Sequence, residues 1–156
     1  MSIEKVRAYL TALGLDDRIR EFTVSSATVE LAAEALGCPP AWIAKTLSFG
    51  LSTGVILVVA AGDARIDNKK YRERFGEKAR MLPHDEVAAA VGHAVGGVCP
   101  FAVCENVMVY LDESLRRFPT VYPAAGSASS AVSLSIPELE RAVGRFEWVD
   151  VCKLPE

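Results

Sequence analysis

The chain has 156 residues and a mass of 16.8 kDa, the usual size of one domain that can bury its own hydrophobic core. Its formal net charge of −3 argues against a protein that coats nucleic acid through bulk electrostatics. The longest apolar run, Val55 to Ala61, is far too short to span a bilayer, and the N-terminus lacks the apolar core of a secretory signal. We therefore expect a cytoplasmic protein that has no contact with a membrane.

In the first half of the chain, the apolar pattern predicts three helices and three strands. The expected helices cover residues 2–13, the stretch that follows Ser25-Ser26 and ends at Leu36, and about residues 68–75. The expected strands cover residues 18–24, 43–49 and 55–61. The last two strands are joined by a turn at 50–54, so we expect them to pair as a hairpin. The second of the two is apolar at every position, which is typical of a central strand covered on both faces.

In the second half, a short extended piece precedes a helix, and four further strands surround a last helix. The extended piece covers 79–82, the helices 83–91 and 137–143, and the strands 107–111, 120–124, 131–135 and 146–152. Several strands are joined by turns too short for a crossover connection. The sequence therefore favours the α+β class with a mixed sheet, in one domain over residues 1–156.

Lys45 is the most unusual residue of the predicted strands. Alternation along the strand places it on the same face as Ile43, Leu47 and Phe49. An ammonium on an apolar face reaches solvent, finds a buried partner, or faces a pocket whose ligand supplies the counter-charge. Only the last of these is functional, and the residues alone favour a structural role.

Charge is segregated along the chain. Residues 65–80 contain seven basic and three acidic side chains, a local excess of +4 against −7 for the remainder. A run of this kind is either a solvated helix surface or a phosphate-binding patch.

Several common motifs are excluded. The four cysteines form no C-x-x-C pair, and His84 and His93 complete no zinc-ligand spacing with them, so no metal is expected. Lys45-Thr46 looks like the end of a P-loop, but Pro39 and Ala44 stand where that motif requires glycine.

The loop from Gly96 to Phe101 contains two glycines and Pro100. Such a loop can point backbone amides at a carbonyl oxygen that becomes negative during attack, and a nearby ammonium adds to this stabilisation. The alternative is an ordinary tight turn. Cys99, in the same loop, would need a general base to act as a nucleophile, and nothing in the sequence assigns a histidine to it.

Three segments, in this order, resemble the YbaK family. They are Lys45-Thr46-Leu47 on a strand, the turn Ala60 to Asp63 followed by the basic helix, and the loop Gly92 to Pro100. The family comprises free-standing aminoacyl-tRNA deacylases and the editing domain inserted in many bacterial prolyl-tRNA synthetases. The resemblance runs from about residue 20 to the end of the chain and implies a barrel-like mixed sheet of six or seven strands, flanked by helices, with a pocket along the lysine strand.

The resemblance also implies an activity, the trans-editing hydrolysis of the ester that joins a wrong amino acid to tRNA. Water is the nucleophile, assisted by substrate groups such as the terminal ribose hydroxyl, and neither a metal nor a cofactor is expected. The expected substrate is tRNA for proline that carries a small amino acid such as alanine, cysteine, serine or 2-aminobutyrate. Prolyl-tRNA synthetase is an expected partner.

Matching the family's motifs residue by residue gives the expected site. The expected catalytic residues are Lys45, Gly96 and Gly97; the expected substrate-binding residues are Thr46, Val98, Pro100, Gly126 and Ser127; and the expected tRNA contacts are Lys69, Lys70, Arg72 and Arg74. The segment Gly126 to Ser130 departs from the family, because it is small and hydroxylic where several members carry basic residues. The contacts made by those basic residues cannot be carried over.

Two alternatives stay open. A binding module with the same fold would recognise tRNA, an aminoacyl group or a partner protein without turnover, and would leave mischarged tRNA intact. A cysteine hydrolase that uses Cys99 would be inactivated by Cys99→Ser, a change that a water-dependent mechanism tolerates.

Overall fold

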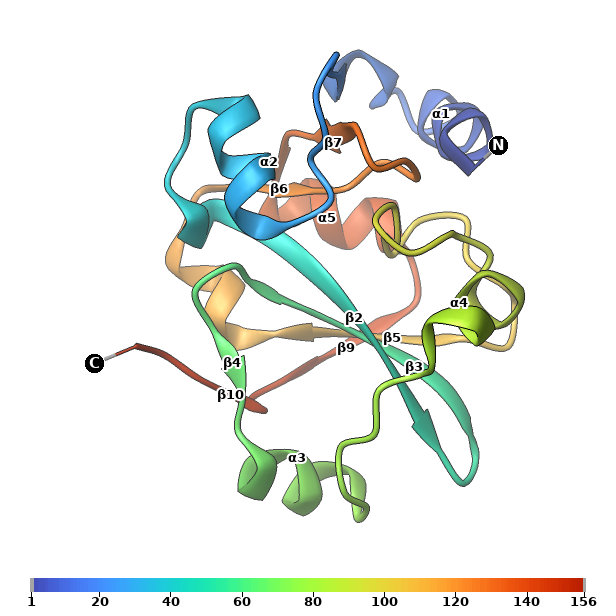
Figure 1. The fold of residues 1–156 in the computed structure, drawn as a ribbon, viewed down its shortest axis with the longest axis vertical. Coiled ribbons are helices and arrows are strands. Elements are labelled where there is room, and N and C mark those ends of the chain that lie inside the picture. The colour runs from blue at the N-terminus through green and yellow to red at the C-terminus, as the bar shows by residue number, and fades with distance from the viewer. Residues whose placement is uncertain (1, 156) are drawn as a thin grey trace.

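A curled, mixed six-stranded sheet with the order β8-β6-β2-β3-β5-β9 forms the centre of the fold (Figure 1). The computed structural model describes residues 2–155. The strands of this sheet are β2 (Ile43–Leu51), β3 (Gly54–Ala61), β5 (Met108–Asp112), β6 (Thr120–Pro123), β8 (Leu134–Ser135) and β9 (Phe146–Val149). The pairs β2–β3 and β6–β8 are antiparallel, whereas β2–β6, β3–β5 and β5–β9 are parallel. The expected fold, a single α+β domain with a barrel-like mixed sheet, is confirmed.

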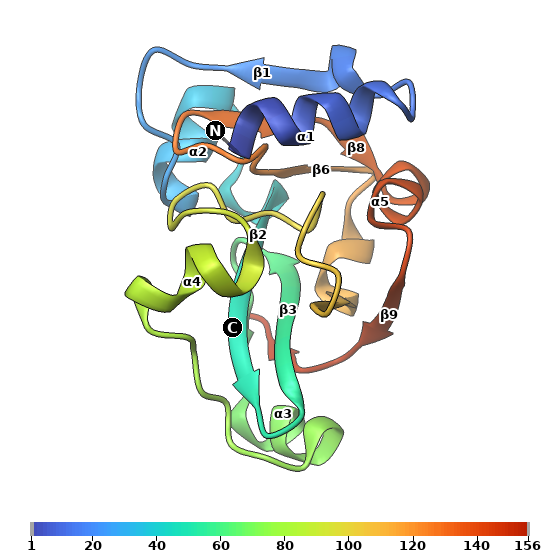
Figure 2. The ribbon, with the colours of Figure 1, turned by 90° about the vertical axis from the view of Figure 1, so that its right-hand side faces the viewer.

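Two small sheets complete the strands within residues 2–155. One pairs β1 (Ile19–Glu21) with β7 (Ser130–Val132), and the other pairs β4 (Arg65–Ile66) with β10 (Cys152–Lys153). Five helices surround the sheets, namely α1 (Ser2–Thr11), α2 (Val29–Leu36), α3 (Asn68–Phe75), α4 (His84–Val91) and α5 (Ile136–Val143). Figure 2 shows α1 and α3 at opposite ends of the molecule. No helix among these residues is long and apolar enough to cross a bilayer.

The hairpin of β2 and β3 contributes the central strands of the hydrophobic core. The expected turn at 50–54 is tighter than predicted, because β2 continues to Leu51 and β3 begins at Gly54. Gly54 has a φ of 144°, a conformation that residues with a Cβ rarely adopt. From Leu57 to Ala61, β3 is fully buried, as its continuous apolar run predicts for a central strand.

Side-chain caps define the helix boundaries. Thr28, rather than Ser25 or Ser26, caps α2, because its hydroxyl accepts a hydrogen bond from the Leu31 amide at 3.2 Å. Asp67 caps α3 in the same way, and Gly76 ends this helix with a φ of 76°. The basic helix therefore has the bounds that the sequence predicts.

Three predicted strands are wrong in extent. The strand expected at 18–24 is limited to β1, outside the central sheet. The strand expected at 131–135 is divided into β7 and β8, which pair with different strands. The strand expected at 146–152 is interrupted between β9 and β10, where Asp112 Oδ1 accepts a hydrogen bond from the Val151 amide at 2.9 Å. The extended piece at 79–82 forms only one bridge, between Met81 and Phe49.

Candidate functional site

A pocket of about 290 Å³ lies along one edge of β2. Its lining includes Ile43 to Ser48 of β2, Ser26 to Val29 at the start of α2, Met81 and Leu82, Val95, Gly96 and Val98, Tyr122 and Ala124, and Ser130 and Ala131. These residues come from segments far apart in the sequence, and the sheet topology brings them together.

The pocket occupies a gap in the pairing of β2. One edge of β2 pairs with β3 along its whole length, but the other edge pairs with β6 only at Ile43 and Ala44. The next backbone hydrogen bonds at this edge join Leu82 N–H to Ser48 O, at 3.0 Å, and Gly50 N–H to Arg80 O, at 2.9 Å. The stretch of β2 from Lys45 to Leu47 therefore lies between two docked segments, both of which contribute lining residues.

Lys45 lines this pocket, and its ammonium is half-buried against the turn that follows β3. Its Nζ donates hydrogen bonds to Ala64 O and to Gly62 O, the latter at 3.4 Å. Burial lowers the pKa of the Lys45 ammonium from its ordinary value. An ammonium has three donors, so two contacts with carbonyls leave one donor for a ligand. The sequence did not identify a partner for the Lys45 ammonium, and the structure shows that backbone carbonyls of the protein bind it.

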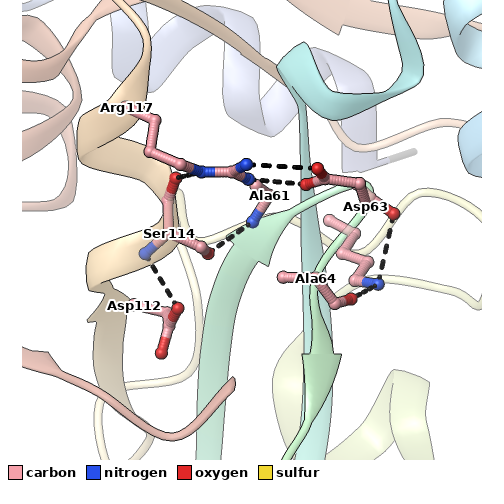
Figure 3. A network of polar contacts seen from close by, with 8 residues as sticks. Ala61, Asp63, Ala64, Asp112, Ser114 and Arg117 are labelled. Atoms are coloured by element: carbon pink, nitrogen blue, oxygen red, sulfur yellow. Dashed lines mark hydrogen bonds and ion pairs between the residues drawn. The ribbon is translucent and has the colours of Figure 1, made fainter. Parts of the chain in front are cut away.

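A salt-bridged network holds this turn in place (Figure 3). Arg117 forms a two-pronged ion pair with Asp63, with Nη2–Oδ1 at 2.6 Å and Nη1–Oδ2 at 3.1 Å. Arg117 Nε also donates to Ser114 O, and Ser114 Oγ accepts a hydrogen bond from the Ala61 amide at 3.1 Å. The hydrogen bond from Arg117 holds the pKa of the Asp63 carboxyl below its usual value.

Gly62 is required at this turn for steric reasons. A Cβ at this position would lie 2.1 Å from Pro40 O and 2.8 Å from a methyl group of Val29. The turn can therefore pack against α2 and the segment before β2 only with glycine at this position. The sequence motif Ala60 to Asp63 thus has a physical role, the placement of the carbonyls that hold Lys45.

The glycine loop contributes two of its expected residues to the pocket. Gly96 and Val98 are lining residues, whereas Gly97 and Pro100 are buried outside the lining. The Gly97 amide donates to Ala94 O at 3.0 Å, and a Cβ on Gly97 would lie 2.6 Å from the backbone nitrogen of Ser127. The structure therefore places Gly97 in the packing between two loops.

In the loop from Gly126 to Ser130, likewise, some residues pack against other elements and one lines the pocket. Gly126 packs beneath α1, where a Cβ would lie 2.8 Å from the Ser2 carbonyl, and neither Gly126 nor Ser127 lines the pocket. Ser127 Oγ instead donates to Ser130 Oγ at 2.7 Å, and Ser130 is the lining residue. Ser26 lines the pocket beside it, and its hydroxyl donates to Ser130 O at 3.4 Å.

Ser26 and Ser130 are pocket-lining residues that the sequence pattern did not predict. Each is at least 90% buried, a rare condition for serine, but burial cannot be read from an isolated serine in a hydroxyl-rich segment. The position of Ser130 next to the strand expected at 131–135 was the only sequence feature that could have indicated its burial.

Cys99 lies outside the pocket lining and is fully buried. Burial raises the pKa of its thiol to about 12, so the reactive thiolate is strongly disfavoured. His93 Nε2 lies 3.6 Å from Cys99 Sγ but only 2.6 Å from Phe101 O, which engages the ring nitrogen that a base would need. This geometry argues against the cysteine hydrolase.

The basic side chains in and near α3 are of two kinds, those that form ion pairs with carboxylates of the described chain and those that do not. Lys70 Nζ pairs with Asp150 Oδ1 at 3.1 Å and donates to Cys152 O, while Arg74 lies 3.6 Å from a carboxylate oxygen of Glu147. A separate hollow of about 640 Å³ is lined by Asn68, Lys69, Arg72, Glu73, Lys78 and Ala79. Within residues 2–155, the three cations of this hollow form no ion pair at 4.0 Å or less.

Comparisons with known proteins identify the family of this chain. A family model described as an aminoacyl-tRNA editing domain matches residues 23–142. The chain is 52% identical over 154 residues to the uncharacterized protein YwhH of Bacillus subtilis (strain 168), and the match covers 98% of each chain. It is 29% identical over 126 residues to the "Putative Cys-tRNA(Pro)/Cys-tRNA(Cys) deacylase EbsC" of Enterococcus faecalis, covering 80% of this chain and 76% of that protein.

A solved structure gives the same result at the level of the fold. The crystal structure of a "putative trans-editing enzyme for prolyl tRNA synthetase" superposes with a TM-score of 0.87 at 29% identity, and the match covers 97% of each chain. The chain belongs to the family of aminoacyl-tRNA editing domains, which confirms the YbaK-type resemblance of its sequence.

Proposed function

We propose that this protein is a trans-editing aminoacyl-tRNA deacylase and that the whole chain acts as one editing domain. The family assignment and the names of two relatives, a Cys-tRNA deacylase and a trans-editing enzyme, support hydrolysis of an aminoacyl ester. The observation that carries the proposal is the position of Lys45 at one pocket with the Gly96 loop.

The chemistry required of the protein is modest. An aminoacyl ester is an activated acyl group, so hydrolysis needs mainly a held substrate and a polarised carbonyl. The third donor of the Lys45 ammonium would point at a substrate oxygen, and the backbone of Gly96 and Val98 would border the same atom. Water would attack, assisted by the ribose hydroxyl of the substrate, with no metal or cofactor.

The pocket favours a small substrate. Its volume of about 290 Å³ lies at the lower limit of ligand pockets in proteins. We propose tRNA for proline that carries alanine, cysteine, serine or 2-aminobutyrate, acting in the cytoplasm in association with prolyl-tRNA synthetase. The relative described as a trans-editing enzyme for that synthetase supports this choice.

A deacylation screen tests the proposal. Purified protein is expected to release a small amino acid from at least one mischarged tRNA, and Lys45→Ala to reduce kcat/KM by about 100-fold, the usual effect of removing one donor to a developing oxyanion. Lys153→Ala, an exposed lysine of β10 outside the pocket lining, is the matched control and should retain activity. Mischarged tRNAs that bind but stay intact would instead identify the binding module, and full activity of Lys45→Ala would exclude the role of the lysine.

A further inference from the structure

The peptide groups of Thr46 are unpaired at the open edge of β2. Gly62 N–H donates to Ile43 O, so Ile43 belongs to the residues whose backbone groups face β3. In an antiparallel pair the direction alternates, so Lys45 and Leu47 also face β3, while Thr46 faces the opposite edge. The bonds of Ser48 and Gly50 with residues 80–82 follow the same alternation, because both face that opposite edge.

Thr46 is the residue of this edge that the docked segments leave uncovered. The ladder with β6 ends at Ala44, and the segment 80–82 begins its bonds at Ser48. Thr46 lines the pocket between them, and its N–H and C=O bond to no backbone group at this edge among residues 2–155. An open strand edge of this kind is a template for another extended segment.

The side-chain hydroxyl of Thr46 also lacks a hydrogen-bond partner within the described chain. Its Oγ1 is buried and has no hydrogen-bond partner among the residues that the structure describes. A buried hydroxyl without a partner is destabilising, and here it belongs to the same partly buried residue as the two unpaired peptide groups. A ligand that supplies one acceptor and at least one donor would satisfy them together.

We infer that Thr46 binds the aminoacyl group of the substrate as if that group were one residue of an added antiparallel strand. Thr46 N–H donates to the carbonyl oxygen of the ester, and Thr46 C=O accepts a hydrogen bond from the α-ammonium. This inference rests on the proposed deacylase function, because it identifies the part of the substrate that the pocket recognises.

The chemistry of the ligand matches the edge. In an antiparallel pair, two facing residues exchange both backbone hydrogen bonds. An α-aminoacyl ester has the same geometry as a peptide residue, with its nitrogen on Cα and its oxygen on the carbonyl carbon beside Cα. Strand addition gives affinity through the main chain and leaves the side chain to a separate wall of the pocket. The ester carbonyl would then receive a donor from Thr46 on the strand that also positions Lys45.

The inference can be tested with an analogue that cannot be hydrolysed. We would compare 3′-(L-alanylamino)-3′-deoxyadenosine with its N-acetyl derivative and with the lactyl analogue, which carries a hydroxyl in place of the amine. Nitrogen-15 spectra of the protein should show a shift of the Thr46 amide with the alanyl compound. The Gly50 amide is the internal control, because it faces the same edge but already donates to Arg80 O. Both altered compounds should bind about tenfold more weakly or worse, since each replaces the charged donor that faces Thr46 C=O by a neutral N–H or O–H donor.

Turnover separates this inference from the proposed function. On a mischarged tRNA that the protein hydrolyses, N-acetylation of the aminoacyl group should lower kcat/KM about tenfold or more, and equal rates would overturn the inference while the deacylase stands. Binding of the alanyl compound with a Thr46 shift, but without turnover of any tRNA, would support the inference and overturn the deacylase. An unchanged Thr46 amide in the saturated complex, or no binding of the alanyl compound, would overturn the inference.

Discussion

At the scale of single residues, Lys45 carries a charge that its surroundings disfavour. Burial lowers its pKa, so at alkaline pH the unfolded chain still binds a proton that the folded chain has lost. Between the folded pKa and the ordinary value near 10.5, the free energy of unfolding contributed by this group therefore rises with pH. Wild-type protein should gain stability relative to Lys45→Met between pH 7 and pH 10.

Urea unfolding of both proteins at the two pH values measures this gain. Lys45→Gln, which removes the same titrating group but keeps a polar side chain, is the control and should give the same pH dependence as Lys45→Met. A wild-type protein that loses stability relative to Lys45→Met as the pH rises would show that the charged form is favoured in the fold, contrary to the effect of burial.

Residue patterns predicted part of the site. Lys45 could be found because a charge on an alternating apolar strand is a local anomaly, and Gly96 because glycines mark a special backbone. Ser26 and Ser130 could not be found, because they reach the pocket only through the packing of α2 and β7 around β2. The carbonyl partners of Lys45 could not be predicted either, because every residue has a backbone carbonyl whatever its side chain.

At the scale of elements, the turn between β3 and β4 links the salt bridge of Asp63 and Arg117 to the lysine. Removal of either partner loosens the turn whose carbonyls hold the ammonium (Figure 3). Because both side chains are partly exposed, we expect a loss of only about 1 kcal/mol of stability for Asp63→Ala. The deacylation kcat should fall about tenfold, since positioning of a catalytic group is sensitive to small displacements.

The kinetic readout distinguishes positioning from general destabilisation. Arg7→Ala breaks a comparable ion pair with Glu21, also 2.6 Å long, and should leave kcat unchanged because that pair joins α1 to β1 outside the pocket lining. Asp63→Ala and Arg117→Ala should be non-additive in kcat, because each removes the same contact. Additive losses would mean that the two residues do not act through one turn.

Element boundaries show why the fold was predictable only in outline. The helix α3 and the hairpin of β2 and β3 follow from local signals, the cap at Asp67 and the glycine at the turn. The divisions between β7 and β8 and between β9 and β10 depend on partners distant in sequence, such as Asp112 for the Val151 amide. The gap in the pairing of β2 that forms the pocket is of the same kind, since it depends on where β6 and the segment 80–82 stop.

At the scale of the whole molecule, α3 lies at the end opposite α1 (Figure 2), and we expect its surface to contact the tRNA body. Lys69, Arg72 and Lys78 share a hollow and are without ion pairs in the described chain, whereas Lys70 and Arg74 each face a carboxylate. Unpaired cations neutralise phosphates without first breaking an internal contact. The double change Lys69→Ala and Arg72→Ala should therefore weaken tRNA binding and reduce the slope of log K against log salt by about two.

The double change Lys70→Ala and Arg74→Ala removes the same charge from the same helix and is the matched control. It should reduce the salt slope by less than one, because its cations are already neutralised by Asp150 and Glu147. Filter binding between about 50 and 200 mM salt measures both slopes. Hydrolysis of a minimal aminoacyl-adenosine ester, which has no tRNA body, should be unaffected by either double change. Equal slopes for the two variants would mean that tRNA contacts α3 without distinguishing its two faces, and loss of activity on the minimal ester would place the hollow in the reaction rather than in tRNA binding.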